Sequence, residues 1–182
     1  RGEIIKSGGT VVKNVTGYDL SKLICGSYGT LAALTEITFK VLPAPEESTT
    51  LVIHNLDINL SLSYLQKAVS SPHDISGASF LPIDPICNKC RMDIKKTFKL
   101  NDLKEEGSIT AIRIEGSKKS INQRIKNLNK ELNISYLNIS VLETLQSEIF
   151  WKKIKNLEVF SKTKNNILRI VIPPSNCNQI IY

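Results

Sequence analysis

The order of two hydrophobic periodicities after residue 48 constrains the fold more than any other feature of the sequence. Apolar residues that alternate with polar ones predict strands, and apolar spacings of three and four predict helices. The predicted elements follow the order strand, helix, strand, strand, helix, strand. They lie at 50–54, 57–70, 75–81, 108–115, 117–132 and 134–141. This βαββαβ order is that of the split βαβ sandwich, so the sequence predicts an α+β domain.

The remaining segments of this half are less regular. A further helix is predicted at about 143–157, and a strand at 167–172 that Pro173 and Pro174 end. Residues 82–107 are polar and rich in lysine, which is typical of an insertion. They contain a CxxC pair, Cys87 and Cys90, without a second pair at zinc spacing, and we assign the pair no role. Both ends of the chain are expected to be cut within an element.

The first 48 residues form a separate, glycine-rich part of the chain. Strands are predicted at 2–6, 10–14 and 30–42, with a brief helix at 20–25. The segment 43–48 contains two prolines and two glutamates, which makes a stiff polar linker. The sequence therefore predicts two domains, 1–48 and 49–182.

Five glycines lie between Gly8 and Gly29, each next to a predicted turn. Such density serves either unusual backbone angles or the close approach of backbone N–H groups to a polar ligand. Composition alone favours the structural explanation, because glycine marks turns more often than ligand sites. The spacing matches neither a P-loop nor the GxGxxG motif of dinucleotide-binding folds.

The order and spacing of residues in this region carry a family resemblance. The runs 12–23 (VKNVTGYDLSKL) and 26–31 (GSYGTL), followed by Leu34-Thr35-Glu36 and by Lys40 to Pro43, resemble the FAD-linked oxidases of the vanillyl-alcohol-oxidase type. Within that family the chain resembles in particular the FAD-binding subunits of bacterial glycolate oxidases. Weaker similarity continues through 75–78, 113–116, Phe150-Trp151, 168–170 and 173–175.

The resemblance implies a fold and a cofactor. Residues 1–48 are expected to be the C-terminal part of a PCMH-type FAD-binding domain, and 49–182 a ferredoxin-like βαββαβ cap or substrate domain with the insertion 82–107. FAD is the implied cofactor, held partly by a pyrophosphate-binding loop that this sequence does not contain. The residues expected beside FAD are Asn14, Gly17, Tyr18, Gly26, Ser27, Tyr28, Gly29, Thr30 and Leu31. Small residues let backbone amides and the Thr30 hydroxyl reach the polar edge of a flavin. Ala32 and Tyr28 depart from the family, which usually has Gly and often Glu at these positions.

Substrate binding is predicted from chemistry and from the same resemblance. A 2-hydroxy acid needs a group that holds its carboxylate, and the arginine fork suits that task. Arg113 and Arg169 lie on predicted strands and match arginines of the family, although a solvated or inter-subunit role is equally compatible with them. His54 and His73 lie at the edges of predicted loops, which favours surface roles. No catalytic residue and no metal ligand is assigned.

The net charge of +7 lies entirely in residues 49–182. A basic domain attracts anions such as nucleic acid, acidic proteins or carboxylates, although scattered lysines also follow from a general preference for Lys, Asn and Ile. A nucleic-acid module is disfavoured, because the strand 110–114 carries none of the stacking aromatic residues of an RNA-recognition motif. No apolar run is long enough to cross a bilayer.

The function expected from the resemblance is that of an FAD-binding subunit that helps to oxidise glycolate or a related 2-hydroxy acid to the 2-oxo acid. Its partners would be a catalytic flavoprotein subunit and an iron–sulfur subunit, in the cytoplasm or peripherally at the inner face of the membrane. The alternative is a structural subunit of such a complex that has lost FAD. Ala32 and the missing metal-binding histidines of related catalytic subunits favour that alternative.

Overall fold

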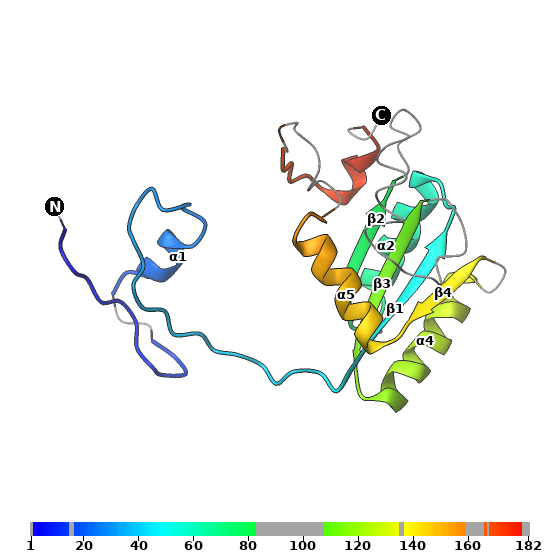
Figure 1. Cartoon of the computed structure of the whole chain (residues 1–182), viewed down its shortest axis with the longest axis horizontal. Helices are drawn as coiled ribbons and strands as arrows, with labels where there is room; N and C mark the ends of the chain where they lie inside the picture. Colours follow the sequence, from blue (N-terminus) through cyan, green and yellow to red (C-terminus); the bar gives the residue numbers. More distant parts are fainter. Residues whose placement is uncertain are drawn as a thin grey trace. The chain divides into compact units, whose positions relative to one another are not determined.

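The computed structural model describes residues 2–14, 17–82, 108–134, 137–158, 166 and 168–179. The chain divides into two compact units, Arg1–Ala44 and Pro45–Tyr182 (Figure 1). The division falls within the proline-containing segment 43–48. Most of the predicted insertion, with Cys87 and Cys90, lies outside the described residues.

The second unit contains a four-stranded antiparallel sheet in the order β2-β3-β1-β4. The strands are β1 (Glu47–His54), β2 (Ile75–Leu81), β3 (Ile109–Gly116) and β4 (Ile139–Leu142). All four coincide with predicted strands, although β4 is shorter and begins later than expected. The two central strands are the most buried, because each has a neighbour on both sides and layers above and below.

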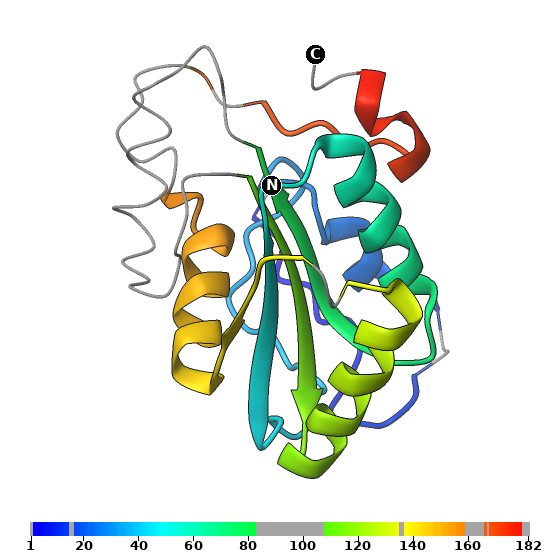
Figure 2. The ribbon, with the colours of Figure 1, turned by 90° about the vertical axis from the view of Figure 1, so that its right-hand side faces the viewer.

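Among the described residues, the helices α2 (Ile58–Ser70), α4 (Lys118–Leu132) and α5 (Thr144–Lys155) cover the two faces of this sheet (Figure 2). Helices α2 and α4 lie on one face, and α5 lies on the other. The predicted helices are confirmed. The described part of the second unit is therefore an α+β sandwich in which the sheet is the middle layer.

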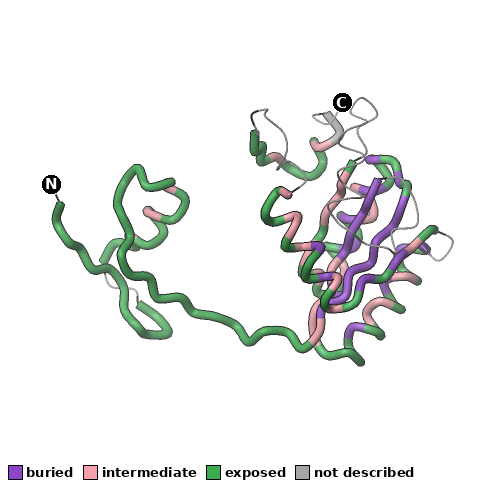
Figure 3. Tube along the Cα trace, viewed as in Figure 1, coloured by how far each residue is buried: buried purple, intermediate pink, exposed green. Residues whose placement is uncertain are grey.

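Two separate cores hold these layers together, and the buried residues concentrate along the central strands (Figure 3). Between the sheet and α2 and α4, the larger core is made of aliphatic side chains such as Ile112, Leu128 and Leu51, each 0–1% exposed. Between the sheet and α5, a smaller core gathers around Phe150, which is fully buried. Its other members are Val52, Ile109, Ala111 and Leu142. The helix α5 is thus attached to the sheet through far fewer apolar side chains than the other two.

Local capping residues explain where the helices begin and end. The Asp57 carboxylate accepts hydrogen bonds from the backbone N–H groups of Asn59 and Leu60, at 2.8 and 3.0 Å, which satisfies two donors at the start of α2. Asn133 adopts the left-handed conformation after α4, and Asn tolerates this conformation better than most residues.

Several predicted strands do not form. Residues 2–6, 10–14 and 30–42 have no strand pairing, and the described residues 168–172 have none either. A strand needs a neighbour to satisfy its backbone groups, and the described residues of the first unit provide none. Its alternating apolar side chains, such as those of Ile4 and Phe39, consequently remain exposed at 100% and 75%. Among its described residues the first unit contains one short helix, α1 (Leu20–Ile24), and the second unit also contains the 3₁₀ helix η2 (Pro174–Gln179).

Over the described residues, no helix has the length and apolarity needed to cross a membrane.

We predict that α5 depends on the buried ring of Phe150. Phe150→Ala removes the largest side chain of the smaller core, and the expected cost is about 3–5 kcal/mol of unfolding free energy. Urea unfolding of the complete chain, followed by circular dichroism, measures it. Leu145→Ala on the same helix is the matched control, because Leu145 is 71% exposed. Equal losses from both substitutions would contradict the packing described here.

A second prediction concerns the start of α2. Asp57→Ala leaves two backbone N–H groups without their acceptor and is expected to lower the unfolding free energy by about 1 kcal/mol. Asp57→Asn keeps an acceptor oxygen and should recover most of that loss. The same urea titration distinguishes the two, and an Asn variant as unstable as the Ala variant would rule out capping as the cause.

Candidate functional site

The segment expected beside a flavin forms a tight turn after α1. Gly26, Tyr28 and Gly29 all have positive φ angles, of 86°, 53° and 78°. The turn is closed by Thr30, whose backbone N–H and hydroxyl both donate to the carbonyl oxygen of Ser27, at 3.1 and 2.7 Å. Three left-handed residues within four positions explain the two glycines, because a side chain is disfavoured at such angles.

The surroundings of this turn are open. A Cβ atom added at Gly26 or Gly29 would have no heavy atom within 4 Å. Tyr28 is 92% exposed and Tyr18, next to the left-handed Gly17, is 93% exposed. A large polar ligand can therefore approach the backbone here, which fits the small-residue pattern. None of the described residues from 2 to 44 is buried, so in this unit the described residues provide one side of a site and no enclosure.

The internal bonds of the turn limit what Thr30 can offer. Its hydroxyl hydrogen and its backbone N–H are both directed to Ser27. Toward a ligand, the Thr30 side chain is therefore available only as an acceptor, through the lone pairs of its oxygen. The sequence prediction did not anticipate this restriction, because it depends on the turn geometry.

Just before the turn, Asp19 caps the start of α1. Its carboxylate accepts from the Lys22 backbone N–H at 3.2 Å and pairs with the Lys22 ammonium at 2.9 Å. The hydrogen bond from the Lys22 side chain holds the pKa of Asp19 below its usual value, and the same bond raises the pKa of Lys22. Both groups are exposed, so their role is to define the start of α1.

The second candidate residue, Arg113, lies on the central strand β3 on the face covered by α5. Its Nε and Nη2 atoms donate to the Oγ and carbonyl oxygen of Ser76, at 3.1 and 3.2 Å. Nε also lies 3.5 Å from Oε1 of Glu115. The guanidinium carbon lies 5.0 Å from the centre of the Trp151 ring, a cation–π distance. Arg113 is therefore held in one position by three different neighbours.

Trp151 is a functional candidate that the sequence analysis did not select. Its indole N–H donates to Thr50 Oγ1 at 2.8 Å, and its ring meets Phe150 edge to face with centroids 5.6 Å apart. The edge of the ring lies against Gly77, where an added Cβ would be 3.1 Å from two ring carbons. The sequence around Trp151 does not indicate these contacts, because Thr50, Gly77 and Arg113 lie on three different strands.

A small hydroxyl cluster lies beside Trp151, beneath the first turns of α5. The Ser147 hydroxyl is 2.9 Å from that of Ser48 and 2.7 Å from that of Thr50. All three side chains are buried, and the Ser48 backbone N–H donates to the Thr144 hydroxyl at 3.3 Å. Hydroxyls on β1 and α5 thus satisfy one another inside the interface.

The structure corrects three of the expectations for charged or titratable residues. Arg169 is exposed and lies outside any strand, so it is not brought together with Arg113 on the sheet. His54 and His73 are buried rather than on the surface, at 3% and 8% exposure. His54 Nε2 lies 2.9 Å from Ser140 Oγ, and His73 Nε2 lies 2.9 Å from Glu131 Oε2. The sequence did not indicate the hydrogen-bond partner of His73, because Glu131 lies 58 residues away.

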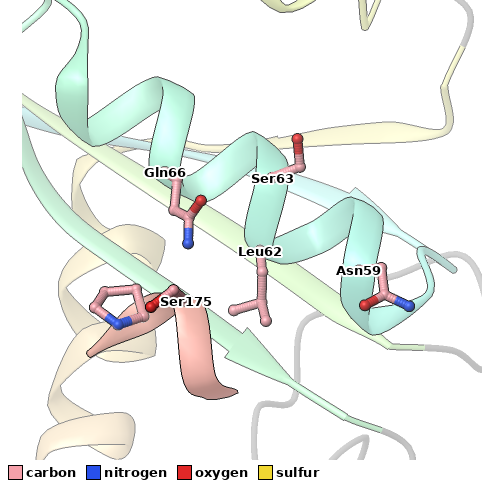
Figure 4. Close-up of a pocket in the computed structure, with 6 residues that line it drawn as sticks. Asn59, Leu62, Ser63, Gln66 and Ser175 are labelled. Carbon is pink, nitrogen blue, oxygen red and sulfur yellow. The ribbon is translucent and has the colours of Figure 1, made fainter. Parts of the chain in front are cut away.

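A shallow hollow of about 210 Å³ lies between α2 and η2 (Figure 4). Its lining is mainly amide and hydroxyl side chains, and none of the predicted site residues is part of it. The lining residues are Asn59, Leu62, Ser63, Gln66, Pro174 and Ser175. Without a titratable group, the hollow offers no acid–base chemistry. Within the described ranges, no three His, Cys, Asp or Glu side chains gather as a metal site would require.

The chain is related in sequence to FAD-linked oxidoreductases. An uncharacterized FAD-linked oxidoreductase of Mycobacterium tuberculosis (strain CDC 1551 / Oshkosh) is 39% identical over 70 residues, which are 38% of this chain and 15% of that protein. The glycolate oxidase subunit GlcE of Escherichia coli (strain K12) is 41% identical over 112 residues, 62% of this chain and 28% of GlcE. The D-lactate dehydrogenase of Anaerostipes hadrus is 52% identical over 52 residues, 29% of this chain and 11% of that enzyme.

These matches confirm the resemblance to FAD-linked oxidases that the glycine-rich segment indicated. The matched residues span between 11% and 28% of the length of these relatives. No protein-family model matches the chain.

The contact between Gly77 and Trp151 gives a third prediction. In Gly77→Ala the new methyl group lies 3.1 Å from the indole, so the ring must shift by a few tenths of an ångström. We expect a loss of about 1–3 kcal/mol in unfolding free energy and an altered emission spectrum of Trp151, the sole tryptophan. Gly9→Ala, where an added Cβ meets no atom within 4 Å, is the control. Unchanged emission in Gly77→Ala would contradict this packing.

Proposed function

We propose that the chain is the FAD-binding part of a 2-hydroxy-acid oxidoreductase. The observation that carries the proposal is the 41% identity to a glycolate oxidase subunit over 112 residues. The open turn at 26–31 supports it, because two left-handed glycines expose the backbone to a large polar ligand. When bound, FAD would supply the acceptor for the hydride of the substrate.

In this proposal the two units have different tasks. Residues 1–48 are the C-terminal part of a PCMH-type FAD-binding domain, and Asn14, Gly17, Tyr18 and 26–31 lie along the cofactor. Residues 49–182 are a ferredoxin-like cap, a proposal supported by their βαββαβ element order and by the strand order β2-β3-β1-β4. Exposed apolar side chains in the first unit are consistent with a domain that other polypeptide segments complete.

We propose that Arg113 orients the carboxylate of glycolate or a related 2-hydroxy acid. A positioned guanidinium offers paired, charge-assisted hydrogen bonds to a planar carboxylate. Arg169 is a second candidate for the same task, although nothing in the described residues holds it near Arg113. The name of the E. coli relative describes a subunit, so we also propose that the chain assembles with a catalytic flavoprotein subunit and an iron–sulfur subunit.

A structural subunit without FAD is the competing proposal. One observation favours it: the hydroxyl and amide of Thr30 donate to Ser27 within the turn, and the Ser27 amide donates to the Ile24 carbonyl oxygen at the end of α1. Ala32 adds a methyl group where the family usually has glycine. These features reduce the number of groups that the segment can direct at a flavin.

The visible absorption spectrum of the complete gene product that contains these residues separates the two proposals. A bound flavin gives the oxidised-flavin spectrum, which glycolate should bleach. In Gly29→Ala the strained position, with φ of 78°, should distort the turn and lower the flavin content severalfold. Gly8→Ala is the matched control, because Gly8 has the same φ of 78° and lies outside the predicted cofactor segment.

The possible results are distinct. A coloured protein that loses flavin in Gly29→Ala, and keeps it in Gly8→Ala, supports the first proposal. A colourless, folded protein favours the structural subunit. Equal loss of flavin in both variants would show that the cofactor does not depend on the turn at 26–31.

A further inference from the structure

The hydrogen bonds of Arg113 use one edge of its guanidinium group. Nε–H and one N–H of Nη2 point in the same direction, and Ser76 accepts from both through its Oγ and its carbonyl oxygen. Ser76 therefore binds the side edge in a bidentate manner, as a carboxylate does elsewhere. The side chain cannot rotate without breaking both bonds.

The opposite edge, formed by Nη1 and the second N–H of Nη2, is the end of the fork. Among the described residues, Nη1 makes no hydrogen bond or ion pair with the protein. The side chain is 26% exposed, so this end can be reached from solvent. Trp151 supports one face of the group at 5.0 Å, which fixes the plane of the fork. A guanidinium held in this way loses little conformational entropy when it binds a planar anion.

A carboxylate of the protein already lies beside this group. Glu115 is two residues along β3, so its side chain leaves the same face of the sheet as that of Arg113. Its Oε1 atom is 3.5 Å from Nε, longer than the 2.7–2.9 Å typical of a strong charge-assisted bond. Arg124 donates to the carbonyl oxygen of Glu115 and holds the backbone at this point. The ion pair between Glu115 and Arg113 is thus long, while the backbone of Glu115 is held in place by Arg124.

We propose that Arg113, supported by Trp151 and Ser76, binds a small carboxylate at the open end of its fork, and that Glu115 is an internal competitor that weakens this binding. Glu115 lowers the positive potential at the guanidinium and repels a second carboxylate. Because both side chains are more than a quarter exposed, the competition is modest and an external carboxylate can overcome it. The choice of a 2-hydroxy acid as the ligand rests on the proposed function, whereas the site and its competitor rest on the geometry alone.

The 182-residue chain, without flavin, is sufficient for the test. Sodium glycolate is added to ¹⁵N-labelled protein at constant ionic strength, and the Arg113 Nε–H signal is followed together with the emission of Trp151. Arg113→Lys identifies the signal by its loss. We expect saturable changes with glycolate, and none with the neutral analogue glycolamide.

The variants test the competition directly. Glu115→Gln removes the internal carboxylate and should lower the dissociation constant for glycolate about threefold, the scale of a surface ion pair. Glu148→Gln makes the same change of net charge on an exposed position of α5 and should leave the constant unchanged. Arg113→Lys keeps the charge but loses the fork, so glycolate should bind about tenfold more weakly, as judged by Trp151 emission.

Three results would overturn the proposal. The first is no glycolate-dependent change in either signal of the unsubstituted chain. The second is equal tightening by Glu115→Gln and Glu148→Gln, which would indicate an effect of net charge. The third is glycolate affinity in Arg113→Lys that equals that of the unsubstituted chain.

The titration is independent of the flavin measurement. A colourless gene product with a working Arg113 site would refute the proposed FAD function and leave the carboxylate site standing. A flavin-containing protein without glycolate binding at Arg113 would refute the carboxylate site and leave the proposed FAD function standing.

Discussion

The pairing of β1 with β3 is the interaction on which the rest of the second unit depends. Eight residue pairs join Glu47–His54 to Ile109–Gly116, and seven of the eight residues of β1 are buried. This ladder joins segments about 60 residues apart and satisfies the backbone groups along one edge of each strand, while β4 and β2 pair with the other edges. It also brings Thr50 opposite Arg113, which places the Trp151 partner and the Arg113 side chain on the same face of the sheet.

The two faces of that sheet are covered by different chemistry. Toward α2 and α4 the contact is almost entirely aliphatic and supplies most of the buried apolar surface. Toward α5 the apolar contact is small, and hydroxyl groups of Ser48, Thr50 and Ser147 fill the remainder. Hydrogen bonds of this kind contribute little net stability but fix the position of a helix. The face that stabilises the fold is therefore not the face that carries the candidate site.

Sequence periodicity predicted the second unit well, because its strands and helices bury one face and repeat accordingly. It failed for 2–6, 10–14 and 30–42, since alternation predicts a strand only where a partner supplies the hydrogen bonds. It also misjudged His54 and His73, whose partners Ser140 and Glu131 are distant in the chain. The turn at 26–31 could be predicted from its two glycines, which tolerate left-handed backbone angles, and from a family resemblance. The neighbours of Arg113 could not, because they come from β2, β3 and α5.

The arrangement around Trp151 explains why these long-range contacts matter together. The indole binds Thr50 on β1 through its N–H, meets Gly77 on β2 with its edge, and supports Arg113 on β3 with its face. A displacement of α5 would therefore alter the support of Arg113 and the hydroxyl cluster at once. Conversely, an anion that binds Arg113 more tightly when Trp151 supports it would stabilise the docked position of α5. Ligand binding at the fork and the attachment of α5 are thus linked through one side chain, and each should stabilise the other.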